Sequence, residues 1–181
     1  MKKILLLSVL LLNLNAKAQR FEDYFTDATL RIDYTFSGNT KHQEIALDKL
    51  NRSPRWYGKR RRLTEVPVEG NGQIIVRDHR SDSIIYKNSF STLFQEWLSY
   101  DEAKTTPRSF ENVFLVPMPK DTIDVTLTLY DNRRKPMASM HHQVVPTDIL
   151  IRKIGYDRQT PHVQLLTPKD STACIRIAFV A

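Results

Sequence analysis

The sequence predicts a mainly β protein, an antiparallel β-sandwich with one short helix. Seven or eight short strands recur about ten residues apart between turn signals, the spacing typical of a sandwich. Strands do not alternate with long helices, which disfavours a parallel α/β sheet. The 181 residues are 41% hydrophobic and carry a net charge of +7. A single cysteine excludes a disulfide framework within the chain.

The first 18 residues have the pattern of a signal peptide. Lysines at positions 2 and 3 precede the apolar run Ile4–Leu12, and Ala16–Ala18 is a small-x-small cleavage pattern. We expect cleavage between Ala18 and Gln19, and a secreted or periplasmic protein. An uncleaved membrane anchor is the alternative, but the run is shorter than the about 20 apolar residues that span a bilayer. No transmembrane anchor is therefore expected.

Alternating apolar side chains predict the first strands. Residues Leu30–Phe36 alternate with a period of two and end at the turn Ser37–Asn39. Glu44–Leu50 fits either a strand or a helical turn; we favour a strand that pairs back on the first, because short turns join neighbours. Gln73–Arg77 and Ile84–Tyr86 are rich in β-branched residues and predict a hairpin.

One stretch, Ser89–Ser99, has helical rather than strand spacing. Its apolar residues fall at i, i+3, i+4, i+7 and i+8, which predicts a short amphipathic helix whose stripe faces the core. Ser91 or Thr92 would cap it. The stripe consists of Phe90, Leu93, Phe94, Trp97 and Leu98.

Strands return in the last third of the predicted domain. Val113–Val116 is expected to end at Pro117, because proline cannot donate a ladder hydrogen bond. Ile123–Tyr130 shows the clearest alternation in the chain, and Met137–Val145 and Ile149–Ile154 predict two further strands. The sandwich domain is thus expected over residues 19–154.

The end of the chain, residues 155–181, is distinct. Gly155–Asp170 reads as a linker. Cys174–Ala181 is a nearly continuous apolar strand of the kind covered on both faces. It is either the last strand of the sandwich or the first strand of a second, α/β-type domain.

Three segments carry a family resemblance. Gly70–Trp97, Arg108–Pro117 and Asp148–Gly155 resemble the N-terminal domain of the secreted bacterial IgA peptidases, metallopeptidase family 64. Cys174–Ala181 is similar to the start of the catalytic domain in that family. The resemblance implies a jelly-roll-like β-sandwich that precedes a zinc peptidase domain, with residues 155–181 a linker and the first strand of a truncated catalytic domain.

The resemblance also implies what this chain does not do. The HExxH motif that binds zinc in the family has no matching position among the 181 residues. We therefore expect a non-catalytic accessory domain, with no cofactor in this chain and zinc only in the missing catalytic domain. Its expected partners are that catalytic domain and a protein or glycan substrate. The substrate implied by the resemblance is an immunoglobulin.

The residues themselves offer no catalytic constellation. His141 and His142 are adjacent in a predicted strand and point to opposite faces, so they are not expected to bind one metal ion together. Cys174 lies in an apolar strand and favours a buried structural thiol over a reactive one. No GxSxG nucleophile elbow occurs.

The most conspicuous candidate for a ligand surface is a basic loop with two aromatic residues. Aromatic rings beside basic groups bind polyanions, acidic glycans or anionic membranes, and aromatic rings also stack on sugars. A solvated loop without a ligand is the alternative. Export makes nucleic acid an unsuitable partner, so the competing function is a stand-alone secreted carbohydrate- or surface-ligand-binding module. The candidate residues are Trp56, Tyr57, Lys59, Arg60, Arg61 and Arg62.

Overall fold

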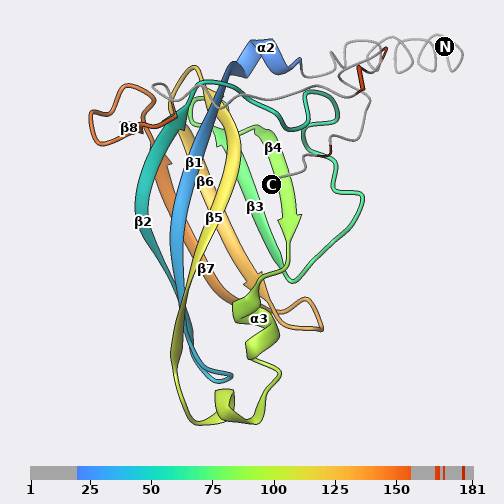
Figure 1. Cartoon of the computed structure of the whole chain (residues 1–181), viewed down its shortest axis with the longest axis vertical. Coiled ribbons are helices and arrows are strands. Elements are labelled where there is room, and N and C mark those ends of the chain that lie inside the picture. Colours follow the sequence, from blue (N-terminus) through green and yellow to red (C-terminus); the bar gives the residue numbers. More distant parts are fainter. Residues whose placement is uncertain (1–19, 156–165, 168, 170–176, 178–181) are drawn as a thin grey trace, which may run out of the picture.

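The computed structural model describes residues 20–155, 166–167, 169 and 177, and within them it is a two-sheet β-sandwich (Figure 1). The strand orders are β5-β1-β2-β8 and β4-β3-β6-β7. This confirms the mainly β sandwich. The strands are β1 Phe25–Gly38, β2 Gln43–Ser53, β3 Gly72–Asp78, β4 Ile84–Phe90, β5 Arg108–Pro119, β6 Ile123–Tyr130, β7 Pro136–Val144 and β8 Arg152–Lys153. The helices are α2 Phe21–Tyr24, α3 Leu93–Trp97 and the 3₁₀ turn η2 Asp101–Lys104.

Strand β1 is the centre of the first sheet, between β5 and β2. Its inward side chains run from Leu30 to Phe36 at every second residue and are almost fully buried, as the alternation predicts. The preferred interpretation of Glu44–Leu50 as a strand is confirmed, since β2 pairs antiparallel with β1, with Ile32 opposite Leu50. A register shift at Asp33 marks a bulge in this pair.

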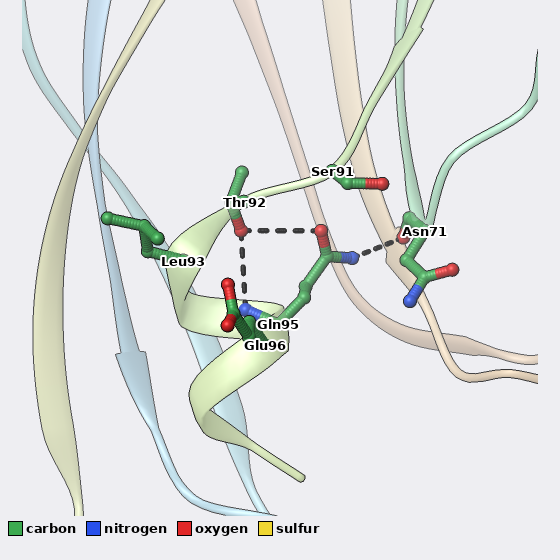
Figure 2. A pocket seen from close by; sticks show the side chains of 6 residues that line it. All are labelled: Asn71, Ser91, Thr92, Leu93, Gln95 and Glu96. Carbon is green, nitrogen blue, oxygen red and sulfur yellow. Dashed lines mark hydrogen bonds between the residues drawn. The ribbon is translucent and has the colours of Figure 1, made fainter.

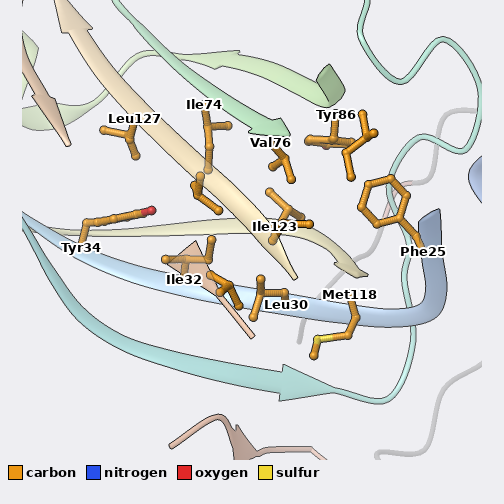
Figure 3. Close-up of a cluster of buried hydrophobic side chains, with 14 of the residues drawn as sticks. Phe25, Leu30, Ile32, Tyr34, Ile74, Val76, Tyr86, Met118, Ile123 and Leu127 are labelled. Carbon is orange, nitrogen blue, oxygen red and sulfur yellow. The ribbon is translucent and has the colours of Figure 1, made fainter. Parts of the chain in front are cut away.

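The second sheet is built from two hairpins, β3–β4 and β6–β7, joined where β3 pairs with β6. The predicted hairpin of residues 73–86 is therefore confirmed. In β6 every second side chain is buried, from Ile123 to Leu129. These side chains pack against the inward residues of β1, and Tyr86 and Phe25 close one end of the core (Figure 3).

Helix α3 is shorter than predicted. Phe90 packs against the core as predicted, but it belongs to β4, so its assignment to the helix is wrong. Leu93 is 71% exposed, so the core-facing stripe is wrong at this position. A five-residue helix has less than two turns and buries only Phe94 and Trp97. Thr92 is the N-cap: its hydroxyl oxygen accepts a hydrogen bond from the Gln95 amide.

Two strand boundaries also differ from the prediction. Strand β5 continues through Pro117 and Pro119. Strand β5 lies at the edge of its sheet and has a neighbouring strand on one side only. Proline, which has no N–H group to donate, is tolerated in an edge strand because no strand on the open side needs that hydrogen bond. The predicted strand Ile149–Ile154 shrinks to the two residues of β8, and β8 pairs with β2 in parallel rather than antiparallel.

Several predictions fall outside the described residues. These are the signal peptide over residues 1–18, its cleavage site, and most of the linker and of the apolar segment 174–181, Cys174 included. Among the residues that the structure describes, no helix is long and apolar enough to cross a bilayer.

Candidate functional site

The basic loop, residues 54–71 between β2 and β3, contains the six predicted ligand residues. Trp56 is only 6% exposed and belongs to the core. Its indole Nε1 donates a hydrogen bond to the carbonyl of Lys59 at 3.1 Å, and its ring meets Tyr86 edge-on at 6.1 Å between centroids. Its inclusion in a ligand surface is therefore wrong: the ring supplies apolar area that anchors the loop.

The Lys59 side chain also points toward the domain and binds backbone carbonyl groups. Its Nζ donates to the carbonyls of Glu65 at 2.8 Å and Lys87 at 2.6 Å, and lies 5.0 Å from the centroid of the Tyr86 ring. Burial lowers the pKa of this ammonium from its usual value. Two of its three N–H donors thus bind backbone carbonyls of the domain itself.

Arg60 ties the loop to the start of the domain. Its guanidinium pairs with the carboxylate of Asp27 and lies 4.6 Å from the centroid of the Phe21 ring, a cation–π contact. The amide of Trp56 donates to the carbonyl of Asp27 at 3.2 Å, which strengthens the same junction. Arg60 thus connects α2, β1 and the loop.

Three of the six predicted residues remain at the surface. Tyr57 is 66% exposed, and Arg61 and Arg62 are exposed. Arg62 has a φ of 52° and its Nε lies 3.8 Å from a carboxylate oxygen of Glu65, a weak contact at this exposure. The structure therefore separates the predicted set into an anchoring half and a solvent-exposed half.

A shallow hollow of about 390 Å³ lies beside α3, lined by none of the six predicted ligand residues (Figure 2). The Gln95 side chain bridges it: its Nε2 donates to the Asn71 carbonyl at 2.5 Å and its Oε1 accepts from the Thr92 hydroxyl at 3.3 Å. These groups are already paired with one another, so the hollow offers few free donors. Its lining residues are Asn71, Ser91, Thr92, Leu93, Gln95 and Glu96.

Three of the described histidines, His79, His141 and His142, form two separate arrangements, and the predicted opposite orientation of the adjacent pair is confirmed. His141 is exposed, with its Nε2 3.9 Å from one oxygen of Asp124, whose other oxygen is 2.8 Å from Nδ1 of His79. His142 faces inward, 2.6 Å from the Tyr34 hydroxyl. Within the described residues no group of three or more His, Cys, Asp or Glu side chains is placed to hold a metal ion.

Tyr34 and His142 form a hydrogen-bonded pair in which both pKa values depart from their usual values. Tyr34 is 1% exposed, and its burial raises the pKa of the phenol well above its usual value. Burial also lowers the pKa of His142, because the imidazolium would lose its hydration. Both groups are therefore neutral near pH 7, joined across the two sheets by a hydrogen bond.

In a comparison with family models, residues 20–141 match the family described as "Peptidase M64 N-terminus". The match includes two of the three resemblance segments, Gly70–Trp97 and Arg108–Pro117, and ends before the third. A search of curated proteins gives no significant match. Because the family model covers more than half of the chain, the chain belongs to the peptidase M64 family and contains its N-terminal domain.

Proposed function

We propose that this chain is the non-catalytic accessory domain of an exported zinc metallopeptidase. The observation that carries the proposal is the family match over residues 20–141, which is a match to the N-terminal part of a peptidase family. Zinc and the general base would come from a catalytic domain that follows, because the 181 residues contain no HExxH sequence.

The role proposed for the sandwich is to pack on that catalytic domain and to assist in placing a protein substrate such as immunoglobulin A. A rigid two-sheet framework supports such a role, since positioning surfaces work best on ordered elements. The signal-peptide pattern of residues 1–18 supports export to the periplasm or the medium.

The competing function, a stand-alone carbohydrate-binding module, has less support. It relied on two neighbouring aromatic rings that stack on sugars, and one of them, Trp56, is buried. Of the basic residues beside them, Lys59 and Arg60 are engaged with the domain itself. What remains is Tyr57 with two exposed arginines.

The test compares the complete natural polypeptide with residues 19–181 alone. Each is incubated with immunoglobulin A, with and without a zinc chelator, and cleavage is followed by gel electrophoresis. We expect cleavage only by the complete polypeptide, lost on chelation and restored by added zinc. Chelator-sensitive cleavage by residues 19–181 would place the chemistry in this chain. Absence of metal-dependent hydrolysis in the complete polypeptide, tried on immunoglobulin A and on an unfolded protein substrate, would also refute the proposal.

A further inference from the structure

We propose that the apolar turn, residues 145–151 between β7 and β8, is the surface against which the following peptidase domain packs. The inference rests on the proposed function, because it needs a peptidase domain on the C-terminal side of Gly155. It adds the place of contact and the chemistry of the partner surface.

The apolar turn is held by hydrogen bonds within its own backbone. Asp148 donates its amide to the carbonyl of Val145 at 3.0 Å, and Ile151 donates to the carbonyl of Asp148 at 3.1 Å. The carboxylate of Asp148 accepts from the amide of Leu150 at 2.9 Å, the geometry of an Asx turn. Ile151 is buried and fixes the base of the turn. None of these bonds requires an apolar side chain at the tip.

The tip nevertheless carries apolar side chains that point into solvent. Ile149 is 93% exposed and Leu150 is 74% exposed, while Val145 at the start of the turn is 39% exposed. Ile149 is the most exposed large apolar side chain among the residues that the structure describes. Figure 1 shows this loop, in orange next to β8, projecting beyond the edge of its sheet. Adjacent exposed apolar residues on an ordered turn mark a contact surface.

The position of the turn identifies its occupant. Gly155 lies five residues after Leu150, so their Cα atoms are at most about 18 Å apart. Gly155 has a φ of +73°, which lets the chain change direction there. The chain therefore leaves the sandwich beside the apolar turn, and the linker to any following domain starts there.

The size of the surface favours a tethered domain over a separate protein. Two aliphatic side chains bury at most a few hundred Å², whereas a stable complex between separate proteins buries about 1,200 Å² or more. Covalent connection through the linker expected over residues 155–170 raises the effective concentration of the following domain to about the millimolar range, so a small apolar contact is enough.

The charges next to the turn define the partner surface further. Arg152 and Lys153 are both exposed, and neither side chain forms an ion pair with any residue in the described part of the chain. An apolar depression with carboxylates at its rim would complement this arrangement. We therefore expect such a depression on the peptidase domain.

The experiment uses the complete natural polypeptide with two matched double substitutions. One variant, I149D/L150D, places two charges on the tip. The control, V113D/L115D, changes an aliphatic pair that is 48% and 53% exposed on β5, the opposite edge of the sheet from β8. All four positions are exposed, and far-UV circular dichroism checks that both variants fold.

The readout is the rate of limited tryptic cleavage after Arg158 and Lys169, between the two domains. We expect I149D/L150D to be cleaved about tenfold faster than the wild type, equivalent to about 1.4 kcal/mol of lost contact, and the control to be unchanged. Equal rates in both variants, whether raised or not, would overturn the inference. Metal-dependent hydrolysis by the wild-type protein is measured in parallel: if it is absent, the proposed function itself fails.

Discussion

Replacing Trp56 with alanine separates an anchoring role from a ligand-binding role most directly. The indole is 6% exposed, and Gly58 packs on it so closely that a Cβ at that position would lie 2.2 Å from the ring. Truncating a buried Trp costs about 3–5 kcal/mol, and the Lys59 carbonyl also loses its hydrogen bond, worth about 1 kcal/mol. We expect a loss of about 4 kcal/mol in the free energy of unfolding.

The assay is equilibrium unfolding in urea, with the slope compared between proteins. At about 2 kcal/mol per M, a loss of 4 kcal/mol lowers the midpoint by about 2 M. The matched control is Tyr57→Ala, the neighbouring aromatic at 66% exposure, which should change the free energy by less than about 1 kcal/mol. A wild-type midpoint for Trp56→Ala would refute the assignment of this ring to the core.

Three further changes test other parts of the domain. The pKa of His142 is lower in the folded state than in the unfolded state, so the unfolded state binds more protons below about pH 6.5. The free energy of unfolding should therefore fall as the pH drops below this value. Urea midpoints compared between pH 8 and 5 should show a shallower fall in His142→Gln than in the wild type. Gly38→Ala should cost more than about 1 kcal/mol, because φ is +126° and the new Cβ would lie 2.1 Å from the His42 carbonyl oxygen; thermal unfolding checks this against Gly155→Ala, where the closest atom is 3.8 Å away and a smaller loss is expected. Thr92→Ala should remove about 0.5–1 kcal/mol by loss of the helix cap, and Thr92→Ser should not; equal melting temperatures of the two variants would contradict the capping role.

Side-chain alternation predicted the strands well because each sheet has one face on the core. The pattern of β6, from Ile123 to Leu129, is the clearest case in both sequence and structure. The same signal is less clear in β2, where the bulge opposite Asp33 and Tyr34 leaves Asp48 and Lys49 both exposed and breaks the alternation. Pairing to β1 then determines its structure.

Elements that depend on tertiary contacts were not predictable in this way. Helix α2 has four residues, too few to show a helical period, and it is held by contacts such as that of Arg60 with Phe21. The burial of Trp56 depends on Tyr86, which is 30 residues further along the chain. Local composition indicates an exposed loop there, because five of the eight residues 55–62 are basic. The hollow beside α3 brings Asn71 next to Gln95, a proximity with no local signal.

The central place of β1 has a kinetic consequence. Pairing of β1 with β5 places Ile32 opposite Phe114, 82 positions apart in the sequence. The β3–β4 hairpin instead pairs Val76 with Tyr86, 10 positions apart. Loop closure costs about 2 kcal/mol more for the longer connection, from its logarithmic dependence on length. The hairpins of the second sheet can therefore form early, and the first sheet is complete only after the later pairing of β1 with β5. Refolding should then be limited by this late, long-range pairing and fall on the millisecond-to-second scale of sandwich proteins.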